Sequence, residues 1–491
     1  MRYIVARSGP VGPATGLAAA RSLIRHISHQ GSPAAGRHVI IGAVHLDRRA
    51  ALGAGLAATT AVLTGCGRSA SKAAGQPAWA EPVASHEPLA PLAAAGRPVP
   101  TAPSPGAKTA AGTAKIRPPY ADNLEAVLKK YLKPTKDHPK HPGYAGAVAL
   151  VAQDRTTRLT STVGDALRYN AGPVELSPAK RVATRPNSIF DLASLTKVYT
   201  AILTLQLVDQ GKVDLSAPIQ QYLPEFTGTG KDKVTVAMLL AHTSALPVGA
   251  AVTGLADNAA RWRSVLTTPL VKGGVPGTTF RYSSVGLMVL GRLVEKLTGK
   301  SLDKALRDNL TTPLGLKDTG FLPLKWVADK QRLVATDART SRGLLRGTVH
   351  DDVANLLGGV AGHAGVFATA QDVAVIGQML LDGGTYGGTR ILSAAVVKQM
   401  LTDVNKGKPA IDPDRPGRSA DHGLGVEIDQ PWFMGKLASA TSFGHTGFTG
   451  TSLLAVPSRR LVVVLLTNRA HPNWSWSDPD VHRVAVHNTL A

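Results

Sequence analysis

The sequence predicts an α+β fold, with an antiparallel sheet formed by strands from both ends of the folded region. An apolar run of strand length lies at 145–153, and the segment 157–163 can pair with it as a hairpin. Near the C-terminus, apolar segments at 451–456 and 461–466 flank the turn-forming Pro457-Ser458-Arg459-Arg460. Helical patterns dominate between these two hairpins. Strands at both ends with helices between them indicate one mixed domain, whose sheet joins the first and last strands.

The helices predicted between the hairpins flank this sheet and also form a mostly helical subdomain. Including one short helix ahead of the first strand, they are expected at 123–132, 195–210, 236–241, 285–298 and 373–381. No internal repeat is visible. We therefore assign residues 120–491 to a single domain.

The only cysteine of the chain, Cys66, ends a segment with the features of an export signal. Arg48 and Arg49 precede an uncharged stretch at 50–65, which ends in Leu63-Thr64-Gly65-Cys66. A basic start, a short apolar run and small residues before a cleavage site are typical of a signal peptide. The tetrad resembles the lipobox of bacterial lipoproteins, in which the cysteine is diacylated and becomes the mature N-terminus. The alternative is a chance cysteine in an Ala-rich stretch.

This resemblance implies that residues 44–65 are a signal peptide and that Cys66 carries the lipid. The protein is then exported to the outer face of the cell membrane and held there by its lipid anchor only, because the apolar run is too short for a span of about 20 residues. Residues 1–43 have no place in this scheme and are expected to be a misannotated or disordered extension, with translation starting at Val44. Residues 66–119 are rich in Ala and Pro and are typical of a flexible tether.

The net charge of +22 has two interpretations. A strongly basic protein can attract nucleic acid, lipid headgroups or wall polymers. The alternative is an Arg-rich composition spread over a solvated surface. No basic helix and no Lys/Arg run with interleaved aromatic residues is present, so the second interpretation is favoured and no nucleic-acid partner is expected.

A serine followed three residues later by a lysine is a candidate nucleophile–base pair, but the bare pattern has little value because it recurs. Its serines are Ser69, Ser177, Ser194 and Ser301. Ser69 lies in the tether, Ser177 precedes Pro178 among polar residues, and Ser301 begins an ordinary surface helix. Ser194 alone stands at the head of a long apolar helical segment. Context therefore selects Ser194.

A spacing of three residues on a helix places Lys197 on the same face as Ser194, close enough to hydrogen-bond its hydroxyl. The helix N-terminus favours negative charge developing nearby. Burial lowers the pKa of a lysine amine, which lets the amine accept the serine proton. The competing interpretation of this motif alone is a structural serine cap beside a solvated lysine.

Two further motifs support the first interpretation. Tyr282-Ser283-Ser284 precedes an apolar helix, and a tyrosine there can relay a proton to a leaving group, although a lone tyrosine is more often an ordinary packed side chain. His445-Thr446-Gly447 lies just ahead of the terminal hairpin. Its Gly-rich edge lets backbone approach a substrate closely, and the Phe448 amide is a candidate oxyanion donor.

Ser-x-x-Lys, then Tyr-x-Asn, then Lys/His-Thr-Gly in this order resembles the serine β-lactamase and penicillin-binding protein superfamily. The similarity is greatest to its branch of class C β-lactamases, D-alanyl-D-alanine carboxypeptidases and esterases. Other stretches agree, such as Leu239-Leu240-Ala241-His242-Thr243-Ser244 and Leu466-Thr467-Asn468-Arg469. The resemblance implies a β-lactamase/transpeptidase-like fold over about 123–491.

The resemblance also implies the roles of the site residues. Ser194 attacks a carbonyl carbon, and Lys197 and Tyr282 transfer protons. The amides of Ser194 and Phe448 form the oxyanion hole, where one donor is typically worth about 3 kcal/mol in the transition state. Beside them, Ser284, Thr446, Gly447 and His363 are expected to contact the substrate, with His445 in the catalytic group. Neither a cofactor nor a metal is required.

Two positions depart from the commonest family pattern. Ser284 stands where Asn is usual, which removes an amide that would bind the substrate's acylamido group. His445 stands where β-lactamases usually have Lys, a fixed positive charge for a substrate carboxylate, whereas histidine is mostly neutral at pH 7. Both changes argue against efficient β-lactamase activity. Some DD-peptidases and esterases of the family also carry His at this position.

The segments Val349-His350-Asp351-Asp352 and 359–365, which contains His363, are rich in potential ligands. Their spacing fits no standard metal site. They resemble a subgroup of the same family that includes periplasmic carboxypeptidases or esterases. His363 has two open interpretations, one as a residue lining the pocket and one as a structural histidine.

The function expected from the sequence is an exported serine hydrolase that acts on an ester or a D-alanyl peptide-like substrate, either a small molecule or a peptidoglycan-like one. One alternative is a β-lactamase. Another is a catalytically silent wall-binding or sensor protein on the same fold, against which the intact Ser194, Lys197 and Tyr282 argue.

Overall fold

The computed structural model describes residues 119–413 and 415–491. The predicted N-terminal extension, signal peptide and lipidation site Cys66, and all of the predicted tether before Pro119, lie outside these residues. Helix α1 begins at Pro119, one residue before the predicted start of the domain. The helices are α1 (Pro119–Lys130), α2 (Thr196–Asp209), α3 (Val236–Leu240), α4 (Asn258–Thr267), α5 (Ser284–Thr298), α6 (Leu302–Leu306), α7 (Asp352–Leu356), α8 (Ala370–Leu381), α9 (Ala394–Met400), α10 (Pro431–Met434) and α11 (Pro479–Asn488).

The large sheet joins the two ends of the described region, as the sequence predicts. It consists, in spatial order, of β13 (Glu427–Ile428), β14 (Phe443–Thr446), β15 (Ser452–Val456), β16 (Leu461–Thr467), β1 (Gly146–Gln153), β2 (Thr156–Leu167) and β5 (Val182–Ala183). Neighbouring strands are antiparallel, and the first and last long strands pair directly with Ala147 opposite Thr467. Both predicted hairpins, β1–β2 and β15–β16, are present. The α+β prediction is confirmed.

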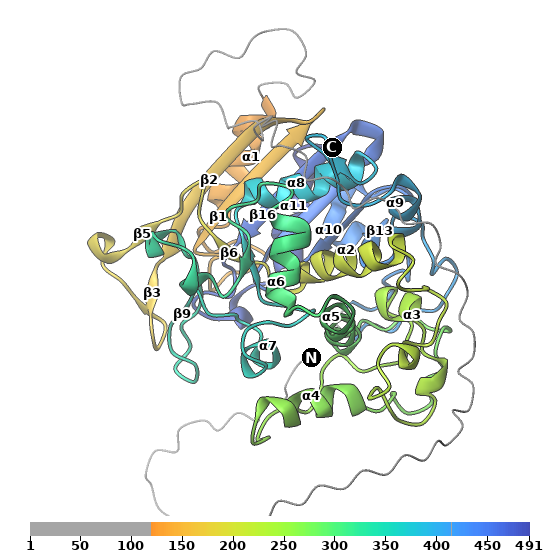
Figure 1. The fold of residues 1–491 in the computed structure, drawn as a ribbon. Coiled ribbons are helices and arrows are strands. Elements are labelled where there is room, and N and C mark those ends of the chain that lie inside the picture. Colours follow the sequence, from red (N-terminus) through yellow and green to blue (C-terminus); the bar gives the residue numbers. More distant parts are fainter. Residues whose placement is uncertain (1–118, 414) are drawn as a thin grey trace, which may run out of the picture. The chain divides into compact units, whose positions relative to one another are not determined.

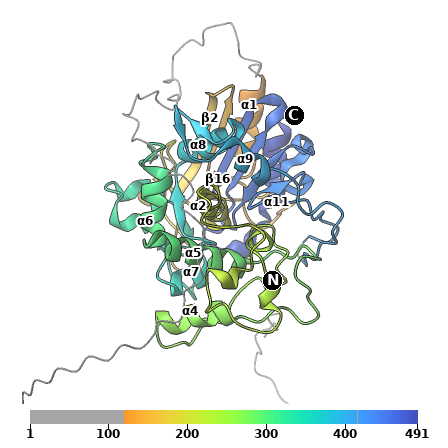
Figure 2. The same ribbon diagram turned by 45° about the vertical axis from the view of Figure 1, so that its right-hand side comes forward.

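Helices cover both faces of this sheet (Figures 1 and 2). Every residue of β1 is buried, and alternate side chains belong to different cores. Val148 and Leu150 pack into the core that contains α8, whereas Ala149 and Val151 pack with α1, α10 and α11. Burial on both faces explains why the strand appears in the sequence as a continuous apolar run instead of an alternating one.

Helix α2 is the central helix of the larger core. Most of its side chains are buried, from Thr196 through Leu205, and it packs against α5. It follows a small sheet in which β10 (Val366–Ala368) lies between β6 (Phe190–Asp191) and β7 (Gly320–Phe321). The chain therefore passes from the buried strand β6 through a short turn into α2.

The remaining strands form short two-stranded pairs outside the main sheet. They are β3 (Tyr169–Asn170) with β4 (Val174–Glu175), β8 (Ala335–Asp337) with β9 (Leu345–Arg346), and β11 (Thr385–Tyr386) with β12 (Thr389–Arg390). The sequence did not predict these pairs.

The five predicted helices are present, with ends displaced by up to four residues, but α4, α7, α9, α10 and α11 were not predicted. The buried face of α11 explains one omission, because it contains His482, Arg483 and His487 beside Val486. Polar residues on the buried face remove the apolar periodicity from which a helix is predicted.

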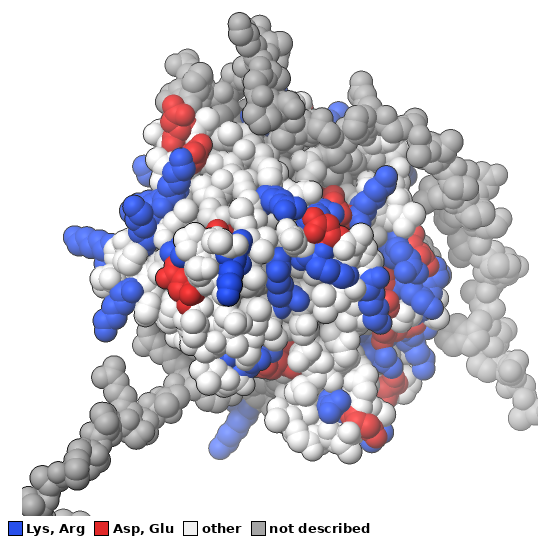
Figure 3. All heavy atoms as spheres, turned by 90° about the vertical axis from the view of Figure 1, so that its left-hand side faces the viewer, with Lys and Arg blue, Asp and Glu red and all other residues white. Residues whose placement is uncertain are grey.

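Among the described residues, the helices are all too short or too polar to cross a lipid bilayer. Figure 3 shows Lys and Arg side chains spread over one face of the molecule, with Asp and Glu side chains between many of them.

Candidate active site

Ser194 is presented by a tight turn between β6 and α2. The carboxylate of Asp191 accepts hydrogen bonds from the backbone N–H groups of Ala193 at 2.8 Å and His350 at 2.6 Å. Ala193 has a φ of +47°, which is uncommon for a residue other than glycine. Ser194 is partly exposed, whereas the residues on both sides of it are buried. The turn therefore presents one hydroxyl from an otherwise buried segment.

Lys197, in the first turn of α2, is fully buried beside this hydroxyl. Its Nζ donates hydrogen bonds to Ser194 Oγ at 2.9 Å and to the carbonyl oxygen of His363 at 3.1 Å. Burial lowers the pKa of Lys197 to about 7, and the nearby carboxylates of Asp351 and Glu427 oppose this shift. Near neutral pH, a substantial fraction of Lys197 is therefore the free amine that a general base requires.

The other described Ser-x-x-Lys motifs have a different environment. Ser177 and Ser301 are both exposed, and so are Lys180 and Lys304. Among the described residues, burial of the lysine distinguishes Ser194 from the serines of the competing motifs.

Tyr282 lies against both members of this pair. The Lys197 Nζ is 4.9 Å from the centroid of its ring, and its hydroxyl is hydrogen-bonded to Ser194. Burial raises the pKa of Tyr282 well above its usual value of 10, although the hydrogen bond with Ser194 acts in the opposite direction. The phenol therefore retains its proton at neutral pH and can donate it. Ser283 fixes this position because its side chain caps α5 by accepting from the Gly286 N–H.

Two side-chain hydrogen bonds connect the loop after β14 to the turn that carries Ser194. Thr449 Oγ1 donates to the carbonyl oxygen of Asp191 at 2.7 Å, and Thr451 Oγ1 donates to that of Leu192 at 3.0 Å. Gly447 lies so close that a Cβ atom there would be 2.2 Å from the Leu192 carbonyl oxygen. The lack of a side chain at Gly447 therefore permits a close backbone contact within the protein. Close approach of a substrate to this edge, which the sequence suggests, stays a prediction.

Phe448 occupies the tip of this loop and is 45% exposed. The turn is closed by the Gly450 N–H, which donates to the Gly447 carbonyl oxygen at 2.9 Å. The Phe448 N–H takes no part in this hydrogen bond. An N–H group must be free in this way to serve as an oxyanion donor. The Ser194 N–H lies in the first turn of a helical segment, where N–H groups lack intrahelical acceptors.

His445 is buried on β14, with its ring centroid 6.4 Å from that of Tyr282. Its Nδ1 donates to the Thr446 carbonyl oxygen at 2.8 Å, and its Nε2 has no hydrogen-bond partner among the described residues. Burial lowers the pKa of His445 to about 3, and the charge of Lys197 adds to this effect. His445 is therefore neutral at pH 7. Beside it on the same strand, Thr446 is also buried.

His363 contacts the site through its backbone. Its ring is buried and its Nε2 lies 2.9 Å from Asp351 Oδ1, while its carbonyl oxygen accepts from Lys197. Ser284 begins α5, and its N–H donates to the Val248 carbonyl oxygen at 3.0 Å. Within 119–413 and 415–491, no group of three or more His, Cys, Asp or Glu residues is arranged to hold a metal ion.

Sequence reasoning missed the residues that hold the site together. Thr449 and Thr451 act on the backbone of a segment more than 250 residues away in the chain, and Asp191 accepts from the His350 N–H 159 residues away. No local motif identifies these three residues. Asp351 was noticed only as a potential metal ligand. Its position before a short helix and its distance of 12 residues from His363 were the available signals.

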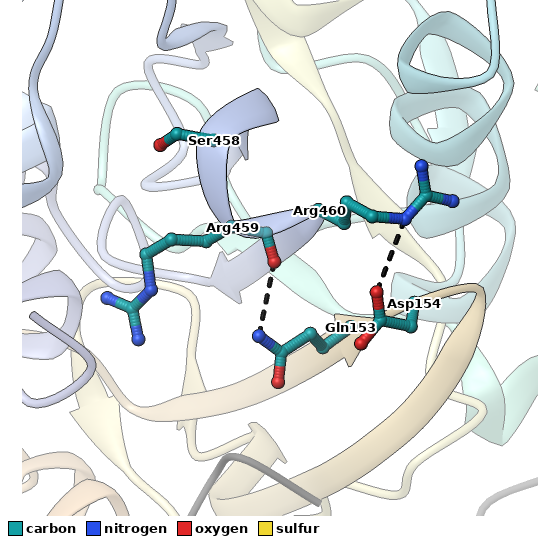
Figure 4. Close-up of a pocket in the computed structure, with 5 residues that line it drawn as sticks. All are labelled: Gln153, Asp154, Ser458, Arg459 and Arg460. Atoms are coloured by element: carbon teal, nitrogen blue, oxygen red, sulfur yellow. Dashed lines mark hydrogen bonds and ion pairs between the residues drawn. The ribbon is translucent and has the colours of Figure 1, made fainter. Parts of the chain in front are cut away.

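A hollow at the other end of the β15–β16 hairpin is a separate feature. Gln153, Asp154, Ser458, Arg459 and Arg460 line it. Arg460 pairs with Asp154 at 3.2 Å, and Gln153 Nε2 donates to the Arg459 carbonyl oxygen at 3.1 Å (Figure 4). This hollow contains no serine–lysine pair, so Ser194 and its neighbours remain the candidate active site.

The chain is similar to several known proteins. The family model described as "Beta-lactamase" matches residues 125–487. A protein of Escherichia coli O157:H7 named "Putative D-alanyl-D-alanine carboxypeptidase" is 32% identical over 67% of this chain and 79% of its own length. A Bacillus subtilis protein named "N-acetylmuramyl-L-alanine amidase" is 33% identical over 67% of this chain and 78% of its own. The solved structure titled "EstCE1, a hydrolase with promiscuous acyltransferase activity" is similar in fold, with a TM-score of 0.58 and 19% identity over 76% of this chain and 98% of that one.

Proposed function

This chain belongs to the Beta-lactamase family, and we propose that it is a serine hydrolase that forms an acyl-enzyme on Ser194. Its substrate is an ester or a D-alanyl amide, as a small molecule or as part of a peptidoglycan-like polymer. The observation that carries the proposal is the 2.9 Å contact between Ser194 Oγ and the Nζ of a buried lysine. The name of the Escherichia coli relative also refers to a D-alanyl-D-alanine substrate.

In the proposed reaction, the neutral amine of Lys197 accepts the hydroxyl proton of Ser194 while Oγ bonds to the acyl carbon. The amides of Ser194 and Phe448 then stabilise the oxyanion, a role in which one donor typically contributes about 3 kcal/mol. Tyr282 donates its phenolic proton to the departing oxygen or nitrogen and recovers one from Lys197. The acyl-enzyme remains until water, which gives up a proton to the same groups, attacks the carbonyl carbon and regenerates Ser194.

β-Lactamase activity is the second candidate, and His445 argues against it. A neutral, buried imidazole provides no fixed charge for the carboxylate of a β-lactam. We therefore place esters and D-alanyl amides ahead of β-lactams as substrates.

We also propose that the mature protein is a lipoprotein, anchored by Cys66 on the outer face of the cell membrane. The proposal rests on Leu63-Thr64-Gly65-Cys66 and on the apolar run before it. A catalytic domain on a long tether can then reach extracellular or wall-linked substrates.

The test is labelling of the protein with a fluorophosphonate and with a fluorescent penicillin, followed by identification of the labelled residue. Ser194→Ala abolishes labelling and p-nitrophenyl ester hydrolysis while the circular dichroism spectrum is unchanged. Lys197→Ala lowers the rate by about 10²- to 10⁴-fold, the usual contribution of a general base.

Ser177→Ala is the matched control, because this serine also precedes a lysine by three residues but is exposed. It should retain wild-type labelling and turnover. Full activity in Ser194→Ala would refute the proposal, as would labelling of another residue. A fully active Lys197→Ala variant would refute the assignment of the base.

A further inference from the structure

One carboxylate oxygen at this site is unused by the protein. Asp351 Oδ1 accepts hydrogen bonds from His363 Nε2 at 2.9 Å and from the Ala354 N–H at 2.8 Å. Its Oδ2 has no hydrogen-bond or ion-pair partner among the described residues, and the side chain is 36% exposed. Asp351 is therefore held rigidly by one oxygen while the other is free to bind a ligand.

Two chains of contacts place Asp351 at the edge of the active site. Through His363, whose carbonyl oxygen accepts from Lys197, it is linked to the base of the reaction. The preceding residue, His350, stacks on the exposed ring of Phe448 with centroids 5.4 Å apart. Asp351 is thus connected to the base through His363 and to the Phe448 loop through His350, and its charge acts on the pKa of Lys197.

The charge state of Asp351 and of its neighbour His445 determines which ligand this carboxylate can bind at the edge of the active site. Burial acts to raise the pKa of Asp351. The interaction with His363 and the hydrogen bond from the Ala354 N–H nevertheless hold this pKa well below its usual range. Asp351 is therefore ionised whenever the enzyme is folded near neutral pH. His445 supplies no opposing positive charge, because it is neutral.

Two arginines at the Phe448 loop donate their guanidinium hydrogen bonds to backbone carbonyl oxygens of that loop. Arg469 Nε donates to Phe448 O at 2.7 Å, and Arg483 donates to the carbonyl oxygens of Gly447 and Thr451. Both arginines are buried. The site therefore offers a free anionic oxygen and, in these two arginines, no free guanidinium group for a substrate carboxylate.

We propose that Asp351 binds a protonated amine on the acyl part of the substrate. The preferred substrates are then aminoacyl esters or amides, in which the carbonyl attacked by Ser194 belongs to a residue with a free amino group. Substrates that carry a carboxylate in this place are disfavoured. The proposal rests on the acyl-enzyme function proposed above and assigns its substrate class.

A charge series of small methyl esters tests the proposal with the full-length protein at pH 7. D-Alanine methyl ester carries an ammonium group, because α-amino groups have pKa values of about 7.7 to 8.0. Methyl propionate is its neutral analogue, and monomethyl succinate carries a carboxylate. The wild type should have its highest kcat/KM with the alanine ester and its lowest with the succinate ester.

Asp351→Asn is the decisive variant. Asparagine caps helices as well as aspartate does and can still accept from His363, so the variant removes the charge and keeps the local structure. The ratio of kcat/KM for the alanine ester to that for methyl propionate should fall by roughly tenfold, the size of one partly exposed charge pair. Asp352→Asn is the matched control, since this neighbouring carboxylate is 74% exposed and pairs with Arg342, and it should leave the ratio unchanged.

The outcomes separate this proposal from the one on which it rests. Failure of the wild type to cleave any of the three esters, or cleavage that survives Ser194→Ala, would refute the acyl-enzyme function. Ser194-dependent cleavage with the same substrate ratio in wild type and Asp351→Asn would refute only the role of Asp351. An equal loss for all three esters in Asp351→Asn would assign the residue to positioning Lys197 and would overturn ammonium recognition.

Discussion

Replacement of Lys197 by methionine should inactivate the protein and also stabilise it. The lysine is fully buried, and burial lowers its pKa from 10.5 to about 7. This difference corresponds to about 5 kcal/mol of destabilisation of the folded state when the amine is charged. Methionine has a similar length and no charge, so it removes that cost while filling the same space.

The size of the gain depends on pH, with a sign fixed by the lowered pKa. Between pH 7 and 10.5 the unfolded chain binds more protons at this residue than the folded protein does, so the cost of burying Lys197 falls as pH rises. It amounts to about 4 kcal/mol at pH 7 and about 2 kcal/mol at pH 9. Loss of the bond to the His363 carbonyl oxygen offsets about 1–3 kcal/mol of the gain.

Urea unfolding of both proteins at pH 7 and pH 9 measures this difference. We expect Lys197→Met to be more stable by about 1–3 kcal/mol at pH 7, with the advantage smaller by about 2 kcal/mol at pH 9. In parallel, kcat/KM of the wild type should rise with pH up to about 7 and then level off, because the free amine is the active form. A variant less stable than the wild type at both pH values, with no change in the difference between them, would refute the low pKa of Lys197.

Three further predictions concern other positions. Gly447→Ala places a Cβ 2.2 Å from the Leu192 carbonyl oxygen. It should therefore destabilise the fold by about 1–3 kcal/mol in urea unfolding and reduce turnover more than tenfold. Gly249→Ala meets open space and should have neither effect in the same assays. His445→Lys should raise penicillin acylation relative to p-nitrophenyl ester turnover by about tenfold, and His445→Ala should lower both; an unchanged kcat/KM ratio in the lysine variant would show that this position does not face the substrate carboxylate. In its own host, the mature protein should begin at Cys66 and partition into detergent, and Cys66→Ala should not; a soluble wild-type chain retaining Met1 by mass spectrometry would contradict the lipobox.

The sequence was sufficient for the features that depend on local periodicity. The spacing of three residues placed Lys197 beside Ser194, and the helix at Ser194 distinguished it from the exposed Ser177 and Ser301. The apolar run at 145–153 indicated the strand β1, and its pairing with β16 followed from the strands expected at both ends of the domain. Each of these signals is carried by neighbouring residues in the chain.

Features made by distant residues with no periodic signature could not be predicted. The Lys197 Nζ binds a backbone carbonyl group 166 residues away, and every residue has such a carbonyl group. The link from Thr449 to Asp191 spans 258 residues and uses a common hydroxyl. In α11, buried His482 and Arg483 occupy positions where a pattern search requires apolar residues. Tertiary contacts overrode local preference in each case.

The two inferences about Lys197 and Asp351 are coupled through charge. The carboxylate of Asp351 raises the pKa of Lys197 against the effect of burial, and so favours the inactive, protonated base. A substrate ammonium group bound to Asp351 would neutralise that carboxylate and add a like charge near Lys197, and both effects lower the pKa of the lysine. Binding of the proposed substrate would therefore itself release the proton that Lys197 must lose before it can activate Ser194. A neutral ester lacks this effect, so recognition of the ammonium group contributes to catalysis as well as to affinity.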